Sequence, residues 1–181
     1  MPTPTRLLAA VLVLTAGAAS SLSAQAPAAN PADVGTIPAI VRAFYEVISG
    51  PAGAPRDWRR DSTLYSPNAF FVAMDEANGK VVHAILTAEE YRQRTNAGFV
   101  KNGFFEQEIG SRIERFGNVA QVRSVYETRR TADGPVTARG VNYLMLYWDG
   151  TRWWITGAVW DDERPNNPIP ATWVGLFETV P

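Results

Sequence analysis

Hydrophobic residues between Thr36 and Gly50 recur at the spacing of one face of a helix. They follow one another at intervals of three and four residues, and the polar residues Arg42 and Glu46 fall off this stripe. Thr36 is a suitable N-cap, and Gly50 is a suitable stop. The pattern therefore predicts a helix that buries one apolar face, made of Ile37, Ile40, Val41, Phe44 and Ile48.

Two further helices are predicted on either side of a short pair of strands. Pro55 can begin a short helix that ends before Pro67. Residues 69–74 and 81–86 have the composition of strands, and Asn78-Gly79 between them is typical of a turn. The residues from Thr87 to Glu90 form a capping box, which predicts a helix from there to Gly98.

Beyond Phe104 the pattern changes to long strands separated by turn residues. The predicted strands cover roughly 104–116, 119–130, 136–148 and 151–162. Each is longer than ten residues, whereas strands in globular proteins most often have about five or six. Long strands in a small domain must bend, so the sequence predicts a strongly curved antiparallel sheet.

Tight turns between these strands predict which residues share a face of the sheet. Ser111 then pairs with Ser124, Ser124 with Asn142, and Asn142 with Gly157. This row of small and polar residues lies on the apolar, inner face, together with Tyr126. Asp161 falls on the inner face at the end of the last strand. Glu106 and Glu108 fall on the outer face, so no carboxyl is expected deep in the inner one.

Helices followed by a curled antiparallel sheet resemble the nuclear transport factor 2-like, or SnoaL-like, superfamily. The resemblance covers about residues 33–163, and it is strongest at residues 139–142, 152–155 and 160–170. These segments are similar to an exported branch of the superfamily that has no assigned activity. The resemblance implies an α+β, cone-shaped (cystatin-like) fold, in which three N-terminal helices pack on a curved antiparallel sheet.

The first 24 residues are typical of a secretory signal peptide. Arg6 precedes an apolar run from Leu7 to Ala19, and small residues lead to a peptidase site before Gln25. The run is shorter than the roughly 20 residues that cross a bilayer. We therefore predict a signal peptide at 1–24, a flexible leader at 25–32, a domain at 33–163, and a tail at 164–181 that packs on it. A periplasmic or secreted protein, free of the membrane after cleavage, is expected.

Composition and charge exclude several classes of function. The 17 Lys and Arg residues nearly balance the 18 Asp and Glu residues, which argues against a nucleic-acid partner. With no cysteine and a single histidine, thiolate zinc sites and multi-histidine metal sites are excluded. No cofactor and no metal are expected.

The polar row on the inner face indicates a pocket for a small apolar or amphipathic molecule. Hydroxyl and amide groups in an otherwise apolar hollow are how such pockets are generally built, and the resemblance implies a cavity at this place. In the alternative, these groups bond one another in a filled core. The predicted ligand-binding residues are Ser111, Ser124, Tyr126, Asn142, Trp58, Tyr65 and Tyr91.

An isomerase, dehydratase or hydrolase is the alternative function. The resemblance to ketosteroid isomerase in architecture implies an inward carboxylate base and a hydrogen-bond donor for the developing oxyanion. Asp161 is the candidate base, with Tyr126 and Asn142 polarising a carbonyl; otherwise Asp161 belongs to a solvated strand end. His83 could form a dyad with Asp75, or be a structural histidine.

The last two strands place apolar residues on the outer face, where a monomer would expose them. Either a second copy or the C-terminal tail must cover this patch. The superfamily resemblance implies pairing of sheet faces, so a homodimer is expected through Tyr143, Met145, Tyr147, Trp154 and Trp160. If the cavity is filled, a dimeric interaction module is the third interpretation of the chain.

Overall fold

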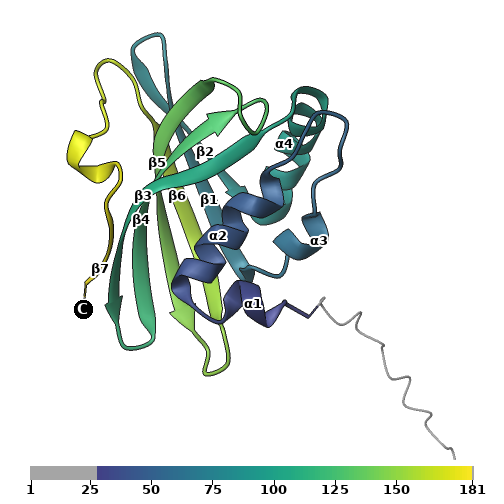
Figure 1. Ribbon diagram of the computed structural model, residues 1–181, viewed down its shortest axis with the longest axis vertical. Coiled ribbons are helices and arrows are strands. Elements are labelled where there is room, and N and C mark those ends of the chain that lie inside the picture. The colour runs from purple at the N-terminus through teal and green to yellow at the C-terminus, as the bar shows by residue number, and fades with distance from the viewer. Residues whose placement is uncertain (1–27, 181) are drawn as a thin grey trace, which may run out of the picture.

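The computed structural model describes residues 28–180, so the predicted signal peptide lies outside the described residues. Helices α1 (Pro31–Val34), α2 (Ile37–Ile48), α3 (Trp58–Asp61) and α4 (Ala88–Asn102) gather on one face of a single sheet (Figure 1). Helix α1 begins inside the segment that was predicted to be a flexible leader. No helix in this part of the chain is long and apolar enough to span a membrane.

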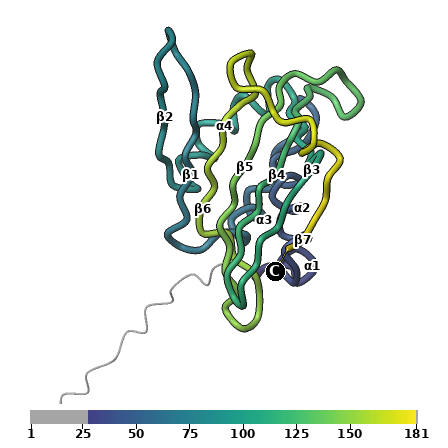
Figure 2. Tube along the Cα trace, turned by 90° about the vertical axis from the view of Figure 1, so that its left-hand side faces the viewer, coloured from purple at the N-terminus to yellow at the C-terminus, as the bar shows by residue number. Residues whose placement is uncertain are grey.

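Seven strands make up the sheet, in the order β2-β1-β6-β5-β4-β3-β7. Their long, curved course around the helices is visible from the side (Figure 2). The α+β cone predicted from the sequence is therefore confirmed. The strand bounds are β1 (Tyr65–Ala77), β2 (Lys80–Thr87), β3 (Phe105–Phe116), β4 (Val119–Arg129), β5 (Val136–Trp148), β6 (Trp153–Asp162) and β7 (Phe177–Val180).

The predicted caps and turns form as expected. The Thr36 side chain accepts a hydrogen bond from the Ala39 amide at the start of α2, and Thr87 and Glu90 make the capping box of α4. Asn78 and Gly79 both have positive φ, as a tight hairpin turn requires. Helix α4 continues through Gly98 to Asn102, because a single glycine weakens a helix without ending it.

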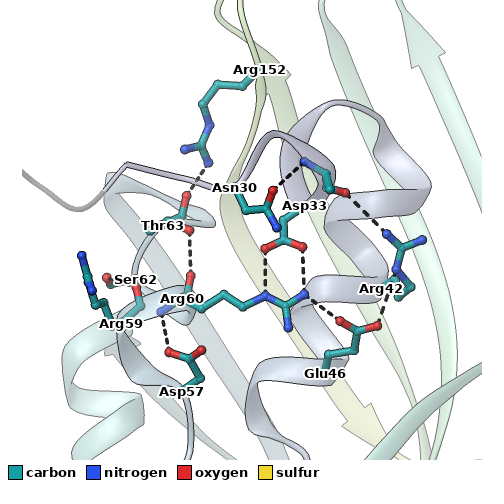
Figure 3. A network of polar contacts seen from close by, with 11 residues as sticks. Asn30, Asp33, Arg42, Glu46, Asp57, Arg59, Arg60, Ser62, Thr63 and Arg152 are labelled. Atoms are coloured by element: carbon teal, nitrogen blue, oxygen red, sulfur yellow. Dashed lines mark hydrogen bonds and ion pairs between the residues drawn. The ribbon is translucent and has the colours of Figure 1, made fainter.

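The core lies between α2 and the middle of the sheet. Ile40 is fully buried against the inner-face residues, of which Val122 and Leu144 are also fully buried. An ion-pair network joins the first three helices. Arg60 of α3 donates to both carboxylate oxygens of Asp33 in α1 and to the Glu46 carboxylate in α2 (Figure 3). The amphipathic helix and this network fix the helical layer over the sheet.

Two of the three predicted strand registers are correct in their central parts, and the third is wrong. Ser111 pairs with Ser124 and Ser124 with Asn142, as predicted. The last hairpin has a wider loop than the assumed two-residue turn, because Trp148 pairs with Trp153. Asn142 therefore pairs with Trp160 and not with Gly157.

Register shifts interrupt several of the strand pairings, and two of them, each a β-bulge, decide which side chains face the helices. The pairing of β3 with β4 shifts between Glu108 and Gly110, and that of β5 with β6 shifts between Met145 and Leu146, opposite Thr156. A bulge adds one residue to one strand, so every side chain beyond it changes face. These shifts bring Glu106, Glu108, Trp160 and Asp162 to the inner face and turn Asp161 outward.

The C-terminal tail packs on the domain. After the helical turn η1 (Ala171–Trp173), β7 adds to the edge of β3 as a parallel strand. Residues 168–170 and Trp173 line a hollow together with Val141 and Tyr143 of the outer face, and the Arg123 guanidinium lies 3.8 Å from the centre of the Trp173 ring. The tail thus covers part of the predicted apolar patch.

Candidate functional site

A cavity of about 360 Å³ lies between the helices and the inner face of the sheet. Seven of its sixteen lining residues are aromatic. Phe71 of β1 stacks on Tyr91 of α4, and Phe99 of α4 stacks on Phe104, with ring centres 5.0 and 4.1 Å apart. The Trp160 ring meets Phe71 and Tyr91 edge-on. The volume and this lining are those of a small-molecule site.

The Glu106 carboxyl belongs to this cavity. The bulge at residue 109 turns it inward, opposite Thr128. Burial and, to a smaller extent, the nearby Asp162 charge raise the pKa of Glu106 to about 8, although the Asn142 amide, whose Nδ2 lies 3.4 Å from Oε1, acts in the opposite direction. Near neutral pH this side chain is therefore mostly a neutral acid.

A tyrosine and an aspartate form the second polar group of the cavity. The Tyr126 hydroxyl donates a hydrogen bond of 2.5 Å to the Asp162 carboxylate. Burial, and then this bond, raise the pKa of Tyr126 far above its ordinary value. Gly140 makes the geometry possible, because a Cβ at that position would lie 2.2 Å from the Tyr126 hydroxyl oxygen.

Below the cavity, a buried chain of hydrogen bonds holds Asn142 in place. Asn142 Nδ2 donates to the Tyr45 hydroxyl at 3.1 Å, and that hydroxyl lies 2.7 Å from Ser124 Oγ. Ser124 in turn donates to Glu108, whose pKa is raised by burial. Asn142 is 3% exposed and Ser124 is 0% exposed. The polar row predicted from the sequence thus faces inward, but most of its hydrogen-bonding capacity is already used within the protein.

The structure divides the predicted ligand-binding residues into two groups. Tyr126, Asn142 and Tyr91 line the cavity. The Ser124 hydroxyl is hydrogen-bonded to Tyr45, and Ser111 lines a smaller hollow beside strand β7. Trp58 donates to Asn96 and Tyr65 donates to Asp61, both outside the cavity. A ligand-binding role for any of them remains a prediction.

Two predicted catalytic residues do not face the cavity. The inward position expected for Asp161 is wrong: it is ion-paired with Arg164, and its neighbour Asp162 lines the cavity. His83 is exposed on β2, opposite Met74 on the outer face. The predicted outer position of Trp160 is also wrong, because the bulge at Thr156 of β6 turns both Trp160 and Asp162 inward.

Sequence reasoning missed Glu106 and Asp162, although the chain carries a signal for both. A glycine inside a strand often marks a bulge, and Gly110 and Gly157 each follow one of the two bulged residues. Within residues 28–180, no group of three or more His, Asp or Glu side chains is placed to hold a metal ion.

Solved structures share this architecture. A protein of unknown function with a cystatin-like fold from Nostoc punctiforme PCC 73102 aligns with a TM-score of 0.52 and 10% identity, over 70% of this chain and 86% of that one. A nuclear transport factor 2-like protein of unknown function from Silicibacter pomeroyi DSS-3 gives 0.49 at 13% identity, over 71% and 94% of the two chains. No protein-family model and no curated protein matches the sequence.

Identities this low establish the fold alone. The chain has a cystatin-like fold, with a partly aromatic cavity between helices and sheet.

Proposed function

We propose that the protein binds a small, largely apolar molecule in the cavity, with the polar end of that molecule against Glu106. The observation that carries the proposal is a carboxyl group kept inside an aromatic cavity. Burying an ionisable side chain is unfavourable unless the protein provides partners, and perturbed carboxyls in cavities are concentrated at functional sites. A filled, purely structural core would have no use for this group.

Filling the cavity tests this function. Ala138 lines the cavity, and Ala77 is exposed at the end of β1. We expect the wild-type protein purified from its own host to retain a ligand in native mass spectrometry. Ala138→Phe should lose that ligand, and the control Ala77→Phe should keep it. Equal retention by both variants would place the ligand elsewhere.

Proton transfer is the second candidate function. With a pKa of about 8, Glu106 becomes ionised around that pH, where its carboxylate can accept a proton as a general base. Glu106 thus takes the place of Asp161 and His83 as the candidate base, because both of those residues lie outside the cavity. Such an enzyme would exchange the hydrogens beside the carbonyl of acetonaphthone for deuterium in heavy water, and Glu106→Gln would not. Exchange that is equally fast in the variant would exclude Glu106 as the base.

The outer face supports pairing with a second copy of the chain. Phe70, Tyr143 and Met145 remain exposed there after the tail has taken its place. Dimerisation through this face, like export from the cytoplasm, is part of the proposal.

A further inference from the structure

We infer that the molecule bound in the cavity carries a protonated amine, held between the carboxyl groups of Glu106 and Asp162. This inference rests on the proposed binding function and specifies its ligand class. It follows from which hydrogen-bonding groups the protein has left free at the polar end of the cavity.

The hydrogen-bond donors of Tyr126 and Asn142 at the polar end are already used. The Tyr126 hydroxyl hydrogen goes to Asp162, and Asn142 Nδ2 donates to the Tyr45 hydroxyl and to Glu106. In contrast, the described residues, 28–180, donate no hydrogen bond to the Asn142 side-chain oxygen or to the second carboxyl oxygens of Glu106 and Asp162. A site with spare acceptors is matched by a ligand that donates hydrogens.

The charge of the cavity favours the same ligand. Two carboxyls line it, close enough for the Asp162 charge to affect Glu106, and the only basic side chain in its lining is Arg130, which is exposed at the end of β4. A cation bound between the carboxyls would favour the ionised form of Glu106 beside Asp162. The faces of Phe71, Tyr91 and Trp160 also attract cations. An ammonium group therefore fits the carboxyl end of the cavity, and an apolar body attached to it fits the aromatic end.

Glu106 is surrounded by groups whose charge bears on pH dependence. Asp162 of β6 and Tyr126 of β4 face it from the sheet, Tyr45 and Tyr91 face it from α2 and α4, and Arg130 lies at the rim. The three tyrosines have raised pKa values and stay neutral. Between about pH 6 and pH 8, Glu106 is therefore the cavity group that ionises, and amine affinity should rise across this interval.

A pair of probes with one skeleton separates the ligand classes. Naphthylethylamine and acetonaphthone differ only in an amine and a carbonyl, and their binding is measured by isothermal titration calorimetry at about pH 8. We expect the amine to bind at least roughly tenfold more tightly, because a hydrogen bond to a charged group is worth that much. Glu106→Gln and Asp162→Asn should each abolish the preference for the amine.

Glu108→Gln is the matched control, because Glu108 bonds Ser124 below the cavity and does not line it. This variant should keep the preference. A ketone that binds as tightly as the amine in the wild type, or acid variants that still prefer the amine, would overturn the amine inference and leave the cavity function standing. If neither probe binds the wild type, the binding function fails, and the inference fails with it.

Discussion

Glu106 is a half-buried acid whose environment differs from that of an ordinary surface glutamate. Its carboxyl is enclosed by the aromatic walls and receives a single long hydrogen bond from Asn142. Burial disfavours the charged form, so the protein keeps the proton to about pH 8, where a free glutamate would lose it near 4.5. The stability of the folded protein must therefore depend on pH through this group.

The sign of that dependence is fixed. The folded state holds a proton that the unfolded state releases between about pH 4.5 and pH 8, so the free energy of unfolding falls as pH rises through this interval. The contribution is at most about 1.4 kcal/mol per pH unit. Glu106→Gln should flatten the dependence, as measured by urea unfolding at several pH values. Parallel curves for the two proteins would show that Glu106 ionises normally.

The contact between Gly140 and Tyr126 is a second residue-scale feature. Gly140→Ala should displace the Tyr126 ring, break its bond to Asp162, and lower the free energy of unfolding by about 1–3 kcal/mol. Gly98 of α4 is the control, since a Cβ there meets nothing within 4 Å. Gly98→Ala should instead stabilise the protein by about 0.5–1 kcal/mol. Chemical denaturation measures both, and equal effects would contradict the proposed crowding at Gly140.

At the scale of elements, helix α4 covers the cavity without a conventional apolar face. None of its residues is fully buried. Tyr91 and Phe99 provide its aromatic contacts, and polar contacts provide the rest: Asn96 accepts from Trp58, and Arg92 pairs with the buried Asp61 of α3 at 2.7 Å. A few polar contacts thus help to hold helix α4 over the cavity.

Removing one of these polar contacts should lower the protection of the α4 amides against hydrogen exchange. Arg92→Ala leaves the Asp61 carboxyl buried without its cation, which typically costs about 3–5 kcal/mol, less whatever relief Asp61 gains by taking up a proton. Arg94→Ala, on the exposed side of the same helix, should have little effect. Hydrogen exchange of the α4 amides measures the difference. Unchanged protection in Arg92→Ala would mean that aromatic contacts alone hold the helix.

At the scale of the whole molecule, the outer face of the sheet remains partly uncovered. The tail covers Val141 and part of Tyr143, but Met145 is 46% exposed and Phe70 is 44% exposed. Met145→Lys should weaken the proposed dimer, and Thr151→Lys, in an exposed turn, should not. Sedimentation at micromolar concentration tests this. A monomeric wild type would exclude the dimer.

Export makes a prediction about the whole chain. Protein recovered from its host should have the intact mass of a chain that begins at Gln25, because the peptidase site follows Ala24. A mass that includes residues 1–24 would contradict the signal peptide.

The misplaced carboxyl groups of the site result from two β-bulges that the sequence analysis did not predict. Local signals predicted helices α2 and α4, the hairpin at Asn78-Gly79 and the approximate limits of the four long strands, since caps and turns act over a few neighbouring residues. The bulges next to Gly110 and Gly157 depend on distant segments: a Cβ at Gly110 would lie 2.1 Å from the Trp173 carbonyl oxygen, and one at Gly157 would lie 2.8 Å from the Phe70 ring. No pattern within one strand reports such contacts.

The amino-acid sequence alone therefore determined the order of the elements, the curved sheet and the inward polar row at Ser124 and Asn142. Only the tertiary structure decided that Glu106 and Asp162, and not Asp161, face the cavity. The physical reason is that side chains alternate along a strand, so one extra residue in each bulge exchanges the two faces beyond it.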